Sequence, residues 1–137
     1  MTDDEIIALL DRSTTVAVVG ASENTEKPAN AIPRILLEAG FTMIPVNPTA
    51  TEIHGQKVYA SLEDVPVPVD IVDVFRPSDE APGIAESAAA IGAKTLWLQQ
   101  GITSEEARRT AEAAGLDYVE DLCIGATIKR LGYSKQS

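Results

Sequence analysis

The feature that most constrains the fold is an uninterrupted apolar run near the N-terminus, TVAVVG, from Thr15 to Gly20. Between the threonine and the glycine every residue is apolar, with none of the polar alternation of a strand that has one solvated face. Such a run is typical of a central parallel strand that is buried on both faces. Parallel neighbours must be joined by long crossovers, usually helices, so the run predicts an α/β domain.

Strand and helix patterns alternate along the rest of the chain, as this prediction requires. We expect further strands at 41–46, 57–60, 70–75, 94–99 and 117–120, and helices at 2–10, 28–40, 62–65, 81–91, 103–114 and 124–131. The strand pattern at 57–60 is the weakest, and Pro33 weakens the start of the second helix because an interior proline lacks a donor. Right-handed crossovers then give a doubly wound, Rossmann-like parallel sheet flanked by helices, in a single domain of residues 1–137 with strand order 3-2-1-4-5-6.

Charge and composition narrow the class of partner. The 137 residues include 11 Lys and Arg against 21 Asp and Glu, a formal charge of −10, and the basic residues are scattered. This argues against nucleic acid, whose binding depends on neutralised phosphates. One cysteine, Cys123, and one histidine, His54, exclude an internal disulfide and a zinc site. With no apolar run near about 18 residues and an acidic N-terminus, we expect a cytoplasmic protein that binds no membrane.

The loop after the first strand has the outline of a phosphate site. In a doubly wound sheet, ligands bind beyond the carboxyl ends of the strands. There Gly20, Ala21 and Ser22 lead to Lys27 and Pro28, at the start of a helix whose amides and dipole attract anions. The loop lacks the Gly-x-Gly-x-x-Gly fingerprint of dinucleotide sites and is no Walker A loop. The alternative is that Gly20 merely permits a tight turn.

Three further strand ends carry candidate binding residues, which are Asn47 and Pro48, Phe75 and Arg76, and Gln100 and Gly101. A standard NAD site needs a carboxylate where Asn47 stands, so this residue argues against NAD. Asparagine can bond a base or ribose, or it can only shape a turn before the proline. Arg76 can reach a phosphate with its planar fork, or it can be an exposed arginine in a loop that enters a helix.

No catalytic set is apparent in the sequence. His54 lies in a polar stretch and is expected at the surface. Cys123 has no second thiol and no histidine near it, so an inert cysteine is favoured over a nucleophile. Asp70 and Asp73 fall on different faces of their strand, and neither pairs with a neighbouring carboxylate. We therefore expect no enzymatic activity.

Five strings occur in a characteristic order and spacing, namely VAVVGAS, Lys27-Pro28, MIPVNP, DIVDVFR and LWLQQGI. They resemble the small stand-alone CoA-binding proteins, which are similar to the N-terminal CoA-binding domain of the succinyl-CoA synthetase alpha subunit. The resemblance implies that the loop at 20–22 and Lys27 hold CoA phosphates. It also implies that residues 47–48 and 75–76 border the nucleotide, and that residues 100–101 border the pantetheine path. Leu122 departs from the family, which commonly has a basic residue before the cysteine.

We therefore expect a protein that binds CoA or an acyl-CoA without ligase chemistry, as a carrier, sensor or accessory module. Two alternatives stay open, a NAD- or NADP-dependent oxidoreductase or redox sensor on the same fold, and a protein-interaction domain with a vestigial ligand loop. The acyl group, the protein partner and the oligomeric state are not readable from the sequence. We expect CoA to bind without a mixed disulfide to Cys123, because the neighbouring Glu120 and Asp121 disfavour its thiolate.

Overall fold

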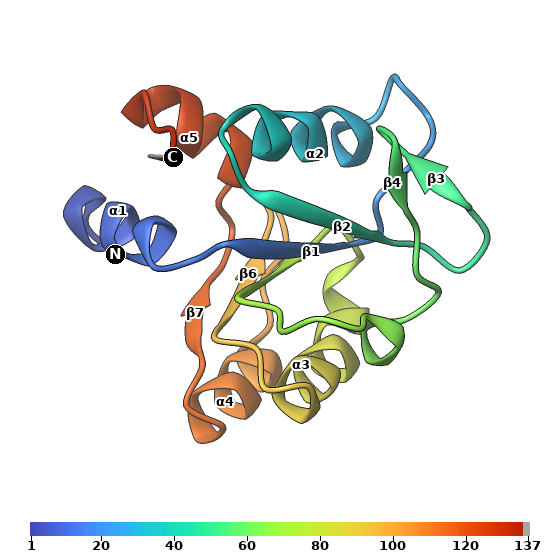
Figure 1. Cartoon of the computed structure of the whole chain (residues 1–137). Helices are drawn as coiled ribbons and strands as arrows, with labels where there is room; N and C mark the ends of the chain where they lie inside the picture. The colour runs from blue at the N-terminus through green and yellow to red at the C-terminus, as the bar shows by residue number, and fades with distance from the viewer. Residues whose placement is uncertain (136–137) are drawn as a thin grey trace.

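Parallel strands form the centre of the computed structural model, which describes residues 1–135 (Figure 1). The five-stranded sheet has the order β2-β1-β5-β6-β7, with all neighbours parallel. Its strands are β1 Thr15–Val19, β2 Thr42–Val46, β5 Ile71–Val74, β6 Thr95–Leu98 and β7 Asp117–Val119. The predicted doubly wound α/β fold is confirmed.

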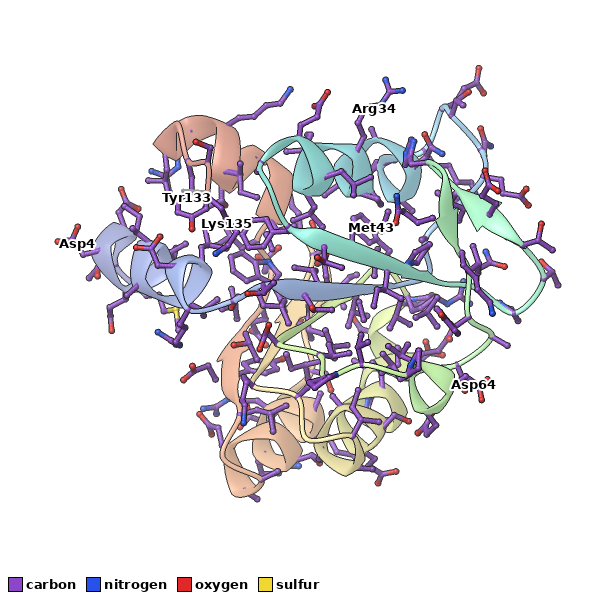
Figure 2. All side chains as sticks on the ribbon, viewed as in Figure 1. Asp4, Arg34, Met43, Asp64, Tyr133 and Lys135 are labelled. Atoms are coloured by element: carbon purple, nitrogen blue, oxygen red, sulfur yellow. The ribbon has the colours of Figure 1, made fainter. Side chains whose placement is uncertain are left out.

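Helices cover both faces of this sheet, as Figure 1 shows. One face carries α1 Asp3–Asp11, α2 Pro28–Glu38 and α5 Ile124–Leu131, and the other carries α3 Ala81–Ala90 and α4 Glu105–Ala113. Each layer encloses its own apolar core. The first contains Leu9, Leu36 and Met43. Figure 2 shows Met43 between β2 and α2. The second combines valine and leucine side chains of the strands with five alanines of α3 and α4, whose small size lets these two helices pack closely on each other and on the sheet.

The C-terminal residues pack against the end of α1. The Tyr133 hydroxyl donates to Oδ1 of Asp11 at 2.8 Å, and the Lys135 ammonium donates to the carbonyl of Leu10 at 3.1 Å. The same ammonium lies 5.0 Å from the centre of the Phe41 ring, a cation–π contact. Figure 2 shows Tyr133 and Lys135 beside α1, so the two ends of the described chain lie close together.

Pro33 is accommodated inside α2 because another backbone N–H takes the place of the one that proline lacks. The helix runs from Pro28 through Pro33 to Glu38. A residue without an N–H leaves the carbonyl four positions earlier, that of Ala29, without its helical partner. The backbone N–H of Ser22 donates to this carbonyl at 3.1 Å. Because Pro33 leaves this carbonyl free, the loop after β1 can form a hydrogen bond to the first turn of α2.

The third predicted strand, 57–60, is not a strand of the main sheet. Residues 52–57 form a separate hairpin of β3 Glu52–Ile53 and β4 Gln56–Lys57, and Tyr59 makes only an isolated parallel bridge with Val46. Its N–H donates to the Pro45 carbonyl at 3.1 Å, and its carbonyl accepts from Asn47 at 3.0 Å. Pro45 has no N–H with which to extend the ladder, which makes β2 the edge of the sheet. The five remaining strands keep their predicted order.

The helix predicted at 103–114 begins one residue later than its sequence signal suggested. Ser104, rather than Thr103, is the N-cap, and its hydroxyl accepts from the N–H of Ala107 at 3.0 Å. Thr103 is held elsewhere, since its N–H donates to the Ser78 hydroxyl at 3.1 Å. Within residues 1–135, no helix is long and apolar enough to cross a membrane.

Candidate functional site

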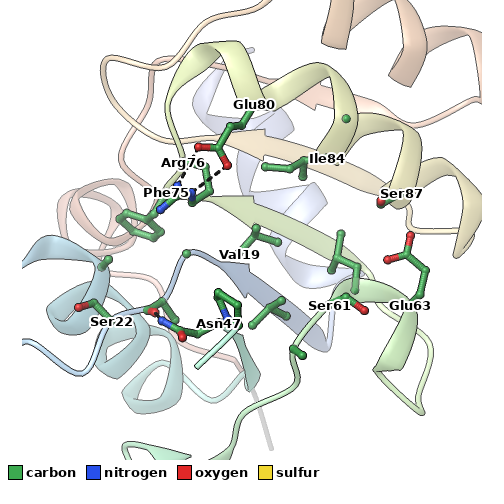
Figure 3. A pocket seen from close by; sticks show the side chains of 18 of the residues that line it. Val19, Ser22, Asn47, Ser61, Glu63, Phe75, Arg76, Glu80, Ile84 and Ser87 are labelled. Atoms are coloured by element: carbon green, nitrogen blue, oxygen red, sulfur yellow. Dashed lines mark hydrogen bonds and ion pairs between the residues drawn. The ribbon is translucent and has the colours of Figure 1, made fainter. Parts of the chain in front are cut away.

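A cleft of about 720 Å³ opens at the carboxyl edge of the sheet (Figure 3). The chain leaves β1 through α2 to reach β2 on one side, and returns to β5 on the other side of β1. Loops that diverge in this way leave a crevice at the point where the strand order reverses. The cleft lies there, bordered also by the short helix η1 Leu62–Asp64 and by α3.

Eight of the eleven predicted site residues line this cleft. They are Gly20, Ala21, Ser22, Lys27, Asn47, Pro48, Phe75 and Arg76, from the loops after β1, β2 and β5. Figure 3 shows Ser22 on one side of the cleft and Glu63 and Ser87 on the other. The structure thus brings together three loops that lie about 25 residues apart in sequence.

The remaining three predicted residues, Pro28, Gln100 and Gly101, are exposed and do not line the cleft. Pro28 is the first residue of α2, beside Lys27. The loop after β6 is separated from β1 by the whole of β5. There the N–H of Gly101 donates to Oδ1 of Asp121 at 2.7 Å, which ties the loop to the end of β7. A binding role for these three residues remains a prediction.

Gly20 is where the first and third of these loops touch. Its φ of +88° lies in the left-handed region that L side chains rarely adopt. A Cβ at this position would lie 2.8 Å from Cδ of Arg76 and 3.0 Å from the carbonyl oxygen of Phe75. The glycine permits a tight turn, and it also permits the close approach of the loops after β1 and β5, which both line the cleft.

The Asn47 side chain is occupied by the protein itself. Its Nδ2 donates to the Ala21 carbonyl at 2.9 Å, and its Oδ1 accepts from the N–H groups of Thr49 at 2.8 Å and Ala50 at 2.9 Å. Asn47 therefore shapes the turn after β2 and holds it against the loop after β1. Direct contact between its amide and a ligand remains a prediction.

The first turn of α2 offers an anion fewer amides than the sequence suggested. Pro28 has no N–H, and the N–H groups of Asn30 and Ala31 both donate to the Lys27 carbonyl, at 2.9 and 3.2 Å. Among residues 1–135, the first-turn N–H without a protein partner is that of Ala29, which lines the cleft. The Lys27 side chain is exposed at the positive end of the α2 dipole. The Ala29 N–H, the Lys27 ammonium and the helix dipole are therefore what α2 can use to attract a phosphate.

Acidic residues share the cleft with the two basic ones. Glu63, Asp79 and Glu80 line it together with Lys27 and Arg76. Arg76 forms a two-pronged ion pair with Glu80, with Nε–Oε1 at 3.1 Å and Nη2–Oε2 at 2.8 Å. Hydrogen bonding to Arg76 holds the pKa of the Glu80 carboxyl below its usual value and, in turn, raises the pKa of Arg76. The planar fork predicted to meet a phosphate is thus engaged by a carboxylate.

Sequence reasoning missed the side of the cleft that α3 and η1 supply. It considered the strand ends and the start of α2, whereas Glu63 lies on η1, and Gly83, Ile84 and Ser87 lie on α3. Glu80 is the N-cap of α3. Gly83 and Ser87 are four residues apart and so share one face of α3. That spacing of small residues was the available signal.

Asp73 is a second feature that the sequence did not reveal. This carboxyl in the middle of β5 is fully buried, and its Oδ1 accepts from Nε2 of Gln99. Oε1 of Gln99 accepts in turn from the N–H of Ile124 at 3.3 Å, at the start of α5. Within residues 1–135, Oδ2 of Asp73 has no hydrogen-bond partner. Burial raises the pKa of Asp73 to about 7.

His54 and Cys123, which the sequence analysis considered for catalysis, lie outside the cleft. Nε2 of His54 donates to the carbonyl of Asn30 at 2.6 Å, on the outer side of α2. Cys123 is the N-cap of α5, where its sulfur accepts from the N–H of Ala126 at 3.4 Å. In the described part of the chain, no three His, Cys, Asp or Glu side chains gather in a way that could hold a metal ion.

The chain is similar to known proteins in sequence and in fold. The family model described as "CoA binding domain" matches residues 14–129. The chain is 40% identical over 120 residues to the uncharacterized protein YneT of Bacillus subtilis, covering 88% of this chain and 89% of that protein. A solved structure of a hypothetical protein from Pyrococcus horikoshii superposes with a TM-score of 0.92 at 37% identity, covering 96% of this chain and 92% of the other.

Longer enzymes share the same segment. The chain is 35% identical over 100 residues to acetate–CoA ligase (ADP-forming) II of Archaeoglobus fulgidus. The match covers 72% of this chain but only 15% of the ligase.

Proposed function

Because the chain belongs to the CoA-binding domain family, we propose that its cleft binds CoA or an acyl-CoA through the phosphates of the ligand. The observation that carries the proposal is the convergence of three strand-end loops, with Lys27 and Arg76, around one cleft at the switch point of the sheet. Ligands of doubly wound sheets bind at such a point.

The phosphates of CoA suit the loop between β1 and α2. Lys27 contributes an ammonium, the N–H of Ala29 a backbone donor, and the Ser22 hydroxyl a further donor, since its oxygen already accepts from Asn24 at 3.0 Å. Charge-assisted bonds to phosphate are roughly twice as strong as neutral ones. The apolar side chains of Val19, Leu62 and Ile84 line the same cleft and would contact the uncharged parts of the ligand.

The proposed role is binding, as a carrier, sensor or accessory module, without bond-breaking chemistry. His54 and Cys123, which were considered for catalysis, lie away from the cleft. In acetate–CoA ligase II of Archaeoglobus fulgidus the matching segment makes up 15% of the length, so it is one part of a much longer enzyme there. A nicotinamide dinucleotide fits less well, because Asn47 stands in place of the ribose-binding carboxylate and its amide is engaged by the backbone.

Isothermal titration of the purified protein with CoA, acetyl-CoA, NAD, NADP and ATP tests the proposal. We expect saturable heat with CoA or acetyl-CoA at a stoichiometry of one, and weaker binding of NAD and NADP. Absence of heat with both CoA species, in protein shown by native mass spectrometry to be free of bound ligand, would overturn it. Tighter binding of NAD than of CoA would favour the oxidoreductase alternative.

A further inference from the structure

The cleft proposed for a polyanion contains more acidic than basic side chains. Lys27 and Arg76 face three carboxylates, those of Glu63, Asp79 and Glu80. The whole chain carries a formal charge of −10, so its long-range field also repels an anion. The local arrangement of these charges must therefore determine which anion can enter.

Glu80 holds Arg76 in the way that a ligand phosphate would. Its two carboxylate oxygens accept from Nε and Nη2 of the same guanidinium, at 3.1 and 2.8 Å (Figure 3). Carboxylate and phosphate both match the arginine fork through two parallel bonds. One edge of the guanidinium cannot serve both partners at once, so a phosphate must displace Glu80 to use it.

The ion pair between Arg76 and Glu80 is weak enough for a ligand phosphate to break it, yet strong enough to lower the affinity for that phosphate. Both side chains are about half exposed, 47% for Arg76 and 46% for Glu80, and they are four residues apart. Exposed pairs of this kind change an equilibrium constant by a factor of about five at most. Because Arg76 lowers the pKa of Glu80, the carboxylate stays ionised at neutral pH, and an ordinary change of pH does not release the arginine.

We propose that Glu80 is a specificity-determining residue of this cleft, which occupies Arg76 in the free protein and must be displaced by a phosphate of the ligand. The proposal rests on the binding of CoA proposed above. A doubly charged phosphate outcompetes a carboxylate for arginine, whereas a ligand bearing only a carboxylate gains nothing by the exchange. Glu80 thus lowers the affinity for every anion and rejects the weaker ones.

A simpler account is that Glu80 only adds negative potential to the cleft. Glu63 provides the matched control, because it is another exposed glutamate lining the same cleft, and it lies on η1 rather than against Arg76. General repulsion predicts equal effects of Glu63→Gln and Glu80→Gln on CoA affinity. Competition for Arg76 predicts a larger effect of Glu80→Gln, and predicts that the excess vanishes when Arg76 is removed.

The experiment is titration of CoA into wild type, Glu80→Gln, Glu63→Gln, Arg76→Ala and the Arg76→Ala/Glu80→Gln double variant. We expect Glu80→Gln to tighten the Kd by roughly 5- to 10-fold and Glu63→Gln by about 2-fold, and Glu80→Gln to have only the smaller effect in the Arg76→Ala background. In a competition experiment, succinate is added to the CoA complex of each protein. Displacement of CoA from Glu80→Gln should need a lower ratio of succinate to CoA than displacement from wild type.

Two results would overturn the inference while leaving CoA binding intact. One is an effect of Glu80→Gln no larger than that of Glu63→Gln, and the other is an equal effect with and without Arg76. If wild type and all variants bind no CoA, the proposed function itself fails. Far-UV circular dichroism checks the fold of each variant. Glu80→Asp, which keeps the charge but shortens the side chain, is a second variant and is expected to tighten the Kd by a smaller factor of about two.

Discussion

Replacing Asp73 by asparagine should remove most of the pH dependence of stability between about pH 5.5 and pH 8. The wild-type carboxyl is fully buried in β5, and burial raises its pKa from 3.8 to about 7. Folding therefore favours the protonated acid. Its contribution to the free energy of unfolding is complete below the unfolded pKa and is lost as the pH rises toward the folded pKa.

The size of the effect follows from the two pKa values. Moving the pKa from 3.8 to about 7 corresponds to a total loss of about 4 kcal/mol. About 2 kcal/mol of this loss falls between pH 5.5 and pH 8. Four exposed carboxyls have lowered pKa values, namely those of Asp3, Glu5, Glu80 and Glu105. Their contributions to the free energy of unfolding are lost only at more acidic pH, so they do not change the stability between about pH 5.5 and pH 8.

Urea denaturation at several pH values measures this directly. Wild type should unfold at a lower urea concentration at pH 8 than at pH 5.5, whereas Asp73→Asn should unfold at nearly the same concentration at both. Asparagine cannot ionise, and its Oδ1 can still accept from Gln99. Asp70→Asn, three residues earlier and just before β5, is the control and should keep the wild-type slope. A stability that rises with pH in wild type, or a slope retained in Asp73→Asn, would refute the reasoning.

Three further predictions concern the cleft. Lys27→Ala should weaken CoA binding by roughly 1–3 kcal/mol, a factor of about 5 to 150, because a charge-assisted contact is lost. Lys94→Ala, at the opposite edge of the sheet, should leave the affinity unchanged. Equal affinities of Lys27→Ala and wild type in titration would remove Lys27 from the site. Gly20→Val should abolish CoA binding and lower the free energy of unfolding by at least about 1–2 kcal/mol, because its φ is +88° and a Cβ meets Arg76 and the Phe75 carbonyl. Gly92→Ala, at φ +73° with open space around it, should show the conformational cost alone, and unimpaired CoA binding by a folded Gly20→Val would contradict the assignment. The affinity for CoA should change little between low and physiological salt, because screening weakens both the local attraction and the long-range repulsion; a fall of several decades would contradict this balance.

Much of the fold was predictable because its strands are buried on both faces. Apolar runs such as TVAVVG identified the central strands, and their ends identified eight residues of the cleft. The edge of the sheet was harder to predict, since 57–60 has a weak strand pattern and the missing N–H of Pro45 limits its pairing with β2.

The electrostatics of the site could not be predicted in the same way. An exposed Arg76 and an exposed Glu80 four residues on are compatible with many arrangements, and only the fold turns both toward one cleft. The alternation of β5 places Asp73 on one face of the sheet but does not say that its only described side-chain partner is Gln99, 26 residues away. Long-range polar contacts of this kind leave no local pattern in a single sequence.

A crystal structure of the protein with CoA tests the central claim most directly. The account predicts that the ligand occupies the cleft between the loops after β1, β2 and β5, with a phosphate within hydrogen-bond distance of the Lys27 ammonium. It also predicts that the Glu80 carboxylate has moved away from Arg76. CoA bound elsewhere on the surface, without contact to Lys27 or to the loop at 20–22, would contradict the account.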